Sequence, residues 1–285
     1  MSKYVIVTET GGDVTAKMAE RYGVRVVPMH ISLGGETFDD GTVAPAELFA
    51  RATELQENPK TSGSTPHDFE VMFDRIHAEE PDATILYLSY SSVLTCSYQS
   101  AHIAAAGRDY VDAIDTCNCS IGQSLVIVRT AHYIVKHPDC TVEDIRAFVE
   151  GLRGRVLAGF VPSDLAYLRA GGRLSNAKFL GAHLLKIKPA IQVVEGELAA
   201  VKKFRGSMVK CCMSLLDHFA SQGPLELERI GLAYSAGLSH EIMEAVEERV
   251  HQMGFKSFDW IEAGGVISSH AGPAAFGAVV VQQEA

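Results

Sequence analysis

The chain has 285 residues and a net charge of −10, and 47% of its residues are hydrophobic while 21% are charged. This composition predicts a globular protein of about two domains with enough apolar residues to build buried cores. The acidic balance argues against nucleic acid or an anionic membrane as the partner.

Short apolar runs alternate with helical patterns in the first half of the chain. Strands are predicted at 3–8, 25–33, 83–89 and 111–116, and helices at 13–23, 45–55, 66–79 and 97–107. This alternation predicts an α/β fold, in which an N-terminal domain of residues 1–155 has a mostly parallel sheet with helices on both faces. In such sheets, ligands bind in the loops at the carboxyl ends of the strands.

After about residue 155 the pattern changes. We expect strands at 154–163, 229–235 and 256–262, helices at 207–221 and 239–253, and a β-hairpin within 188–204 that turns at 195–197. These elements predict a second, α+β domain at residues 156–285.

Several features place the protein in the cytoplasm. The six cysteines form neither a CxxC pair nor a zinc-type spacing, so we expect reduced thiols and no metal site. The N-terminus lacks a signal-peptide pattern. No uncharged apolar run approaches the ~18 residues that span a bilayer, so at most transient membrane contact is expected.

The loop KTSGSTPHDF at residues 60–69 is rich in hydroxyl groups. Ser64 or Thr65 can cap the following helix, and Pro66 suits its first turn. A cap needs one hydroxyl, so Thr61 and Ser62 are left over. From this loop alone, helix capping and ligand binding remain equally open.

Two further loops carry candidate groups. Thr95, Cys96 and Ser97 lie where a helix begins after a predicted strand, and the free N–H groups and dipole of such a helix start attract anions. Helix capping is again the alternative. His270 precedes an Ala-Gly-Pro turn in SSHAGPAAFG at residues 268–277. A lone histidine is more often a packed or surface residue, so only its neighbours favour a function.

The segment 169–205 reverses the charge of the chain. It holds eight lysines and arginines against two glutamates, so its net charge is 8 − 2 = +6 in a chain of −10. A charge run is usually a solvated face, but a local reversal of this size indicates a docking surface for an acidic partner or a site for an anionic ligand.

Together these motifs resemble the DegV family, the fatty-acid-binding subunits of bacterial fatty acid kinases. The resemblance runs nearly end to end and rests on the order of VTETGGDV, KTSGSTPHDF, SSVLTCSYQSA, DTCNCSIGQ, YLRAGGRLSNAKFLGAHLLKIKPAIQV and SSHAGPAAFG. It implies a protein that holds one long-chain fatty acid, with the acyl tail in a tunnel of the second domain and the carboxylate at the domain interface. A separate kinase subunit would phosphorylate that carboxylate, and an acyltransferase of phospholipid synthesis would use the acyl phosphate. The protein itself would be neither the catalyst nor the holder of a cofactor.

The resemblance also assigns residues. The carboxylate site would comprise Thr61, Ser62, Thr95, Ser97 and His270, with Cys96 and Arg173 beside them. The acyl tail would lie against apolar residues whose alternative role is ordinary core: Phe160, Leu168, Phe179, Leu180, Leu184, Leu185 and Ile187. The partner would dock on Arg205, Lys202 and Lys203.

The chain departs from the family pattern in two places. The family usually has Ser-Gly-Thr where this chain has Thr95-Cys96-Ser97, so Cys96 adds volume beside the head group. The family favours Asp-Ser where this chain has Glu9-Thr10, which would shift that loop.

Two other functions remain open at this stage. A stand-alone acyl hydrolase would use Cys96 or Ser97 as nucleophile and His270 as base, but the sequence has no G-x-S-x-G elbow. A phosphate-binding module at the Gly-Gly-Arg segment, residues 171–173, would lack any Walker or G-x-G-x-x-G pattern.

Overall fold

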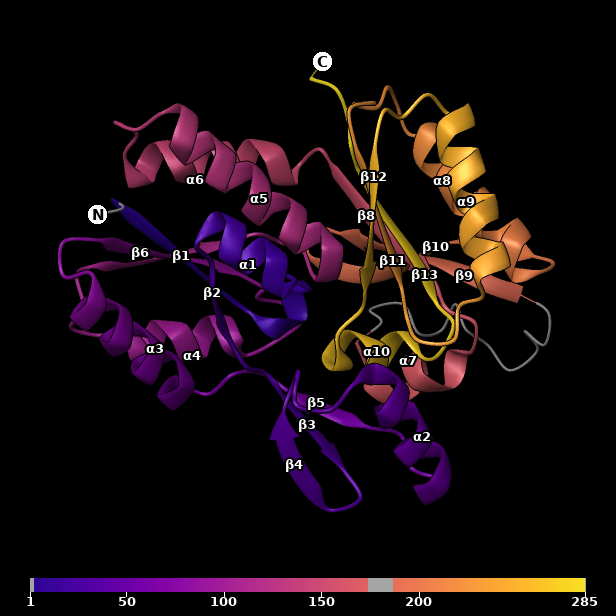
Figure 1. The fold of residues 1–285 in the computed structure, drawn as a ribbon, viewed down its shortest axis with the longest axis horizontal. Helices are drawn as coiled ribbons and strands as arrows, with labels where there is room; N and C mark the ends of the chain where they lie inside the picture. The colour runs from indigo at the N-terminus through magenta and orange to yellow at the C-terminus, as the bar shows by residue number, and fades with distance from the viewer. Residues whose placement is uncertain (1–2, 174–186, 285) are drawn as a thin grey trace.

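A computed structural model describes residues 3–173 and 187–284, which form three β-sheets with helices packed on them (Figure 1). The first sheet is four-stranded and parallel, in the order β2 (Arg25–Val27), β1 (Tyr4–Glu9), β6 (Thr84–Ser89) and β7 (Val111–Asp115). A parallel sheet requires crossover connections, and here these are helices, as the predicted alternation implied.

Helices cover both faces of this sheet. One face carries α3 (Pro66–Glu79) and α4 (Ser97–Ala104), and the other carries α1 (Ala16–Tyr22), α5 (Ser120–Lys136) and α6 (Val142–Arg153). Successive side chains of β1 alternate between them: Val5 and Val7 pack toward α3 and α4, whereas Tyr4 and Ile6 pack toward α5 and α6. The predicted α/β arrangement of the N-terminal part is therefore confirmed.

The second sheet has six strands and is mostly antiparallel. Its order is β10 (Glu197–Arg205), β9 (Ile187–Val194), β8 (Val156–Val161), β13 (Phe276–Val281), β11 (Ile230–Tyr234) and β12 (Phe258–Glu262), with β11 and β12 parallel. Helices α8 (Met208–Ala220) and α9 (His240–Gln252) pack on one face. Between β9 and β10, Glu195 and Gly196 both have positive φ, at 50° and 82°, which makes the predicted hairpin a two-residue turn of type I′.

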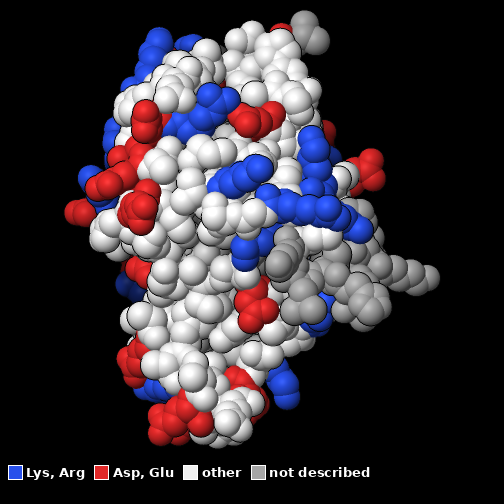
Figure 2. Space-filling view, turned by 90° about the vertical axis from the view of Figure 1, so that its right-hand side faces the viewer, with Lys and Arg blue, Asp and Glu red and all other residues white. Residues whose placement is uncertain are grey.

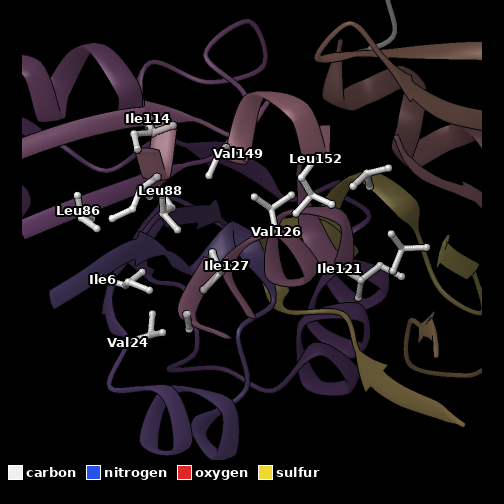
Figure 3. Close-up of a cluster of buried hydrophobic side chains, with 14 of the residues drawn as sticks. Ile6, Val24, Leu86, Leu88, Ile114, Ile121, Val126, Ile127, Val149 and Leu152 are labelled. Atoms are coloured by element: carbon white, nitrogen blue, oxygen red, sulfur yellow. The ribbon is translucent and has the colours of Figure 1, made fainter. Parts of the chain in front are cut away.

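Helix α5 joins the two sheets. Its Val126 and Ile127 belong to one buried cluster that contains Ile6 of the first sheet and Val279 of the second, and Figure 3 shows the part of this cluster around Val126. No predicted element covered α5 or α6. Because this cluster crosses residue 155, the domain boundary at 155/156 stays a prediction.

The third sheet is small and antiparallel, in the order β4 (Glu36–Asp39), β3 (His30–Leu33) and β5 (Lys60–Ser62), and α2 (Pro45–Leu55) packs on it. The prediction of one strand over 25–33 is wrong, because β2 and β3 belong to different sheets. Pro28 lies between them and has no N–H for a ladder. At Pro28 the chain leaves the first sheet and enters the small antiparallel sheet that contains β3 and β5.

Three short helices lie near the contact of the sheets. They are a 3₁₀ turn at Thr10–Gly12, α7 (Leu165–Gly171) and α10 (Gly265–Ala271). In Figure 1, α10 and α7 lie between the six-stranded sheet and α2. Within the described residues, no helix is both long and apolar enough to cross a bilayer.

Candidate functional site

A small polar pocket forms where three segments distant in sequence meet. Thr61 ends up on β5, Thr95 on the loop before α4, and His270 in the last turn of α10. The Thr61 Oγ1 and His270 Nε2 atoms lie 2.8 Å apart, at hydrogen-bonding distance. The pocket is lined by Met29, Thr61, Ser62, Gly63, Tyr90, Leu94, Thr95, Arg173, Val266 and His270. The structure thus brings together Thr61, Ser62, Thr95, Arg173 and His270 of the predicted carboxylate site.

Ser97 and Cys96 have different surroundings. Ser97 is fully buried, and its Oγ accepts the N–H of Ser64 at 3.1 Å and lies 3.1 Å from Thr95 Oγ1. Cys96 is exposed, and neither residue lines the polar pocket. Ser97 therefore braces the first loop against the second, and its role as a carboxylate ligand stays a prediction.

Gly63 allows the two hydroxyl-rich loops to meet. A Cβ atom added at Gly63 would lie 2.6 Å from Thr95 Oγ1 and 2.7 Å from Ser97 Oγ. A Cβ at these distances would force both hydroxyls to move, so glycine permits the close contact seen here. Thr65 forms a capping box with Asp68, so the loop divides into a helix cap at Thr65 and pocket-lining residues at Thr61 and Ser62.

His270 is a neutral imidazole at physiological pH. Burial, followed by the nearby positive charge of Arg173, lowers the pKa of His270 to about 4. Its Nδ1 atom is buried and has no hydrogen-bond partner among the described residues. If Nε2 carries the proton, it donates to Thr61 Oγ1 and leaves the Thr61 hydroxyl hydrogen free to point at a ligand.

Arg173 closes one side of the pocket. It follows α7, which ends at Gly172 with φ of 62°, and its Nε donates to the carbonyl oxygen of Leu94 at 3.0 Å. Its Nη1 donates to the carbonyl oxygen of Gly171 at 3.1 Å. The arginine therefore joins α7 to the second loop and adds a positive charge at the rim.

An apolar cavity lies beside the polar pocket. The two spaces share Tyr90, Arg173 and His270. The cavity is further lined by Cys119, Ser120, Ile121, Gly122, Ala158, Gly159, Phe160, Val193, Leu198, Ala233, Tyr234, Ser235, Ala263, Ile267, Ala271, Ala275, Phe276 and Gly277. A polar pocket next to an apolar cavity suits an amphipathic ligand.

The residues predicted to contact the acyl tail differ in their positions relative to the cavity. Phe160 lines the cavity, and Leu168 is buried in a cluster with Tyr90 and Leu198, which do line it. Ile187 is partly buried at the start of β9 and is not among the lining residues. Phe179, Leu180, Leu184 and Leu185 lie outside the described residues. The cavity lining also includes Tyr90 and residues 119–122, which precede the predicted domain boundary, and the location of the acyl tail stays a prediction.

Glu9 is buried next to the polar pocket and hydrogen-bonds to Tyr90, one of its lining residues. Its buried carboxylate accepts hydrogen bonds from Tyr87 Oη at 2.8 Å and from the N–H of Tyr90 at 3.1 Å. Burial raises the pKa of Glu9 to about 7, although these hydrogen bonds act in the opposite direction. The neighbouring Thr10 accepts the N–H of Met29 at 3.0 Å. In the sequence, Glu9 and Thr10 stand out only as departures from a family pattern, yet each hydrogen-bonds to a residue that lines the pocket.

The hydrolase hypothesis named His270 as base and Cys96 or Ser97 as nucleophile. Among the described contacts, His270 Nε2 pairs with Thr61, while Ser97 Oγ pairs with Ser64 and Thr95.

The predicted docking residues lie on β10, at the edge of the six-stranded sheet. Lys202, Lys203 and Arg205 are all exposed. Figure 2 shows lysine and arginine side chains gathered in a band on this side of the molecule. The band contrasts with the overall charge of −10.

Comparison with known proteins assigns the chain to a family. The DegV family model, described as "Uncharacterised protein, DegV family", matches residues 3–283. A DegV domain-containing protein from Caldanaerobacter subterraneus subsp. tengcongensis is 27% identical over 282 residues, which cover 97% of this chain and 98% of that protein. A solved DegV family protein from Thermus thermophilus, described as binding fatty acid, is similar with a TM-score of 0.87 and 28% identity over 99% of this chain and 100% of the other. DegV from Bacillus subtilis, described as a fatty acid binding protein, has the same fold, with a TM-score of 0.83 and 23% identity over 99% and 100% of the two chains. Because the family model matches almost the entire length, the chain belongs to the DegV family.

Proposed function

We propose that this protein binds one long-chain fatty acid, with its carboxylate in the polar pocket and its acyl tail in the apolar cavity. The observation that carries this proposal is that the polar pocket and the apolar cavity adjoin and share Tyr90, Arg173 and His270 in their linings. A fatty acid has the same order of chemistry, a charged end on an apolar chain. The similar solved protein from Thermus thermophilus, described as binding fatty acid, supports the same ligand class.

The energetics agree with this ligand. Burying ~14 methylenes at ~0.8 kcal/mol each contributes on the order of 11 kcal/mol before ordering costs. An unpaired buried carboxylate would cost several kcal/mol. Donors from Thr61, Ser62 and Thr95, together with the neutral imidazole of His270, offset that cost by hydrogen bonding.

The head group would be held without being neutralised by a tight bidentate ion pair. The guanidinium of Arg173 already donates to two carbonyl oxygens, so the hydroxyls remain the main donors for the carboxylate. A carboxylate oxygen held in this way keeps its nucleophilic lone pairs. We infer that a separate, cytoplasmic kinase subunit transfers a phosphoryl group to it. An acyltransferase of phospholipid synthesis then consumes the acyl phosphate.

The exposed cations of β10 would dock the kinase subunit. We expect Lys202→Glu, Lys203→Glu and Arg205→Glu, made together, to reduce acyl-phosphate formation at least tenfold, because opposed charges then meet at the interface. The oleate affinity of the isolated protein should stay within twofold, since these side chains lie outside the cavity lining. The assay is acyl-phosphate production with the cognate kinase.

A matched control moves the same charge change elsewhere. Replacing the exposed Lys17, Arg75 and Lys136 with glutamate alters the net charge equally, away from β10. Equal loss of turnover in both triple variants would contradict a docking role for β10.

A further inference from the structure

Helix α10, which carries His270, begins against two buried carboxylates. The N–H of Gly264 donates to Asp13 Oδ1 at 2.8 Å, and the N–H of Val266 donates to Asp40 Oδ1 at 3.3 Å. The N–H of Gly265 also bonds to Asp40. The first N–H groups of a helix have no partner within the helix, and negative charge is favourable there. The two carboxylates therefore satisfy the start of α10.

Glycine at the helix start permits this close approach. A Cβ added at Gly264 would lie 3.2 Å from Asp13 Oδ1, and one added at Gly265 would lie 2.8 Å from Asp40 Oδ1. At Gly265 the added Cβ would also lie 2.6 Å from Ile31 Cδ1. The first residues of α10 therefore pack closely against Asp13, Asp40 and Ile31 of β3.

Each carboxylate is itself anchored to a different part of the fold. Asp13 accepts a short hydrogen bond from Ser120 Oγ at the start of α5. Asp40 follows β4, and its own N–H donates to the carbonyl oxygen of Met29 at 2.8 Å. Asp40 therefore belongs to the small sheet whose strand β5 carries Thr61. The small sheet therefore contains Thr61 on β5, and through Asp40 it also contacts α10, the helix that carries His270.

The burial of Asp13 and Asp40 distinguishes them from other helix-capping residues of this chain. Exposed caps satisfy other helices of this chain, such as the capping box of Thr141 and Asp144 on α6. Asp13 and Asp40 are buried instead, and burial raises the pKa of both. Their hydrogen-bond partners are N–H and hydroxyl groups, and the direction of these bonds fixes the position of each carboxylate.

We propose that Asp13 and Asp40 are positioning residues that fix α10 so that the imidazole of His270 meets Thr61 and the ligand carboxylate. This proposal rests on the fatty acid function proposed above. His270 lies only four residues after Val266 on the same seven-residue helix. A shift of about 1 Å at the helix start would stretch the 2.8 Å contact between His270 and Thr61 beyond hydrogen-bonding geometry.

The test compares Asp40→Ala, Asp40→Asn and Asp13→Asn with Asp144→Ala, which removes a helix-start carboxylate on α6. The readouts are the NMR resonance of the His270 ring, assigned by its loss in His270→Gln, and the oleate dissociation constant. Asp40→Ala should shift the resonance and weaken oleate binding about tenfold. The asparagine variants keep one acceptor oxygen and should shift the resonance less. Asp144→Ala should leave both readouts unchanged.

An unmoved His270 resonance in folded Asp40→Ala would overturn the proposal. Should that variant not fold, unmoved resonances in Asp40→Asn and Asp13→Asn would overturn it equally. The NMR measurement uses ligand-free protein, so it is independent of the proposed function. A wild-type protein that ignores oleate would contradict the function, while the resonance shifts would still decide the positioning role.

Discussion

Alanine at both Thr61 and His270 is expected to weaken fatty acid binding by on the order of 100-fold. The two side chains hydrogen-bond to each other at 2.8 Å and line the polar pocket. Hydrogen bonds to a charged group contribute about 1.5–3 kcal/mol each. Because the mutual bond uses one of the two available hydrogens, the pair donates one hydrogen bond to the carboxylate. At the upper end of this range its loss removes about 3 kcal/mol, which corresponds to a factor of ~100 in affinity. Isothermal titration of delipidated protein with oleate measures this change.

The control is a pair of the same residue types outside the site. Thr53 donates to the Phe49 carbonyl oxygen within α2, and His67 is exposed on α3. The double variant Thr53→Ala, His67→Ala should bind oleate like the wild type. Equal affinities for the site variant and the control would remove Thr61 and His270 from the head-group site.

Gly171→Ala is expected to abolish tight binding through a single methyl group. A Cβ at Gly171 would lie 2.1 Å from His270 Nδ1, far inside van der Waals contact. The imidazole must then move, because the added atom is attached to backbone at the end of α7. We expect at least a tenfold loss of oleate affinity, together with a destabilisation of about 1–3 kcal/mol from overpacking. Oleate titration and thermal unfolding measure the two effects.

Gly151→Ala is the matched control for this change. Gly151 lies in α6, and nothing in its surroundings comes within 4 Å of an added Cβ. Alanine there should leave oleate affinity unchanged and stabilise the helix by up to about 1 kcal/mol. A Gly171→Ala variant that binds oleate as well as Gly151→Ala would show that His270 need not occupy its present position.

Local sequence patterns predicted the elements whose signals are local. Phe69, Phe73 and Ile76 recur at helical spacing and are buried on one face of α3. The hairpin turn was predicted within 195–197, but its type followed only from the structure, where Glu195 and Gly196 both have positive φ. The break at Pro28 was missed, because the apolar runs on its two sides look like one strand although they join different sheets.

Helices α5 and α6 were not predicted, although the sequence carries a signal for the start of α6. The capping box of Thr141 and Asp144 marks the start of α6 and could have predicted it. Helix α5 is harder to recognise, because it packs between two sheets and buries polar residues such as Gln123 and Thr130 beside its apolar ones.

The site could be predicted only in part. Thr61 and His270 are separated by 209 positions, and no local pattern relates residues so far apart, so their pairing was expected only through the family resemblance. Asp13 and Asp40 were not predicted as site residues. Each is a buried carboxylate that accepts a hydrogen bond from the start of α10, which is far away in the sequence, and such a contact leaves no periodic pattern. Tyr90 and Ile267 of the cavity were missed because, in sequence, a cavity-lining residue looks like any other apolar or aromatic residue.

The central claim is that one fatty acid binds with its carboxylate in the polar pocket and its acyl tail in the apolar cavity. Native mass spectrometry of delipidated protein after addition of oleate tests it most directly. We predict a single adduct with the mass of one oleate per chain, which is lost in the Thr61→Ala, His270→Ala variant. A wild-type protein that remains ligand-free with both oleate and palmitate, or a variant that keeps the full adduct, would contradict the account.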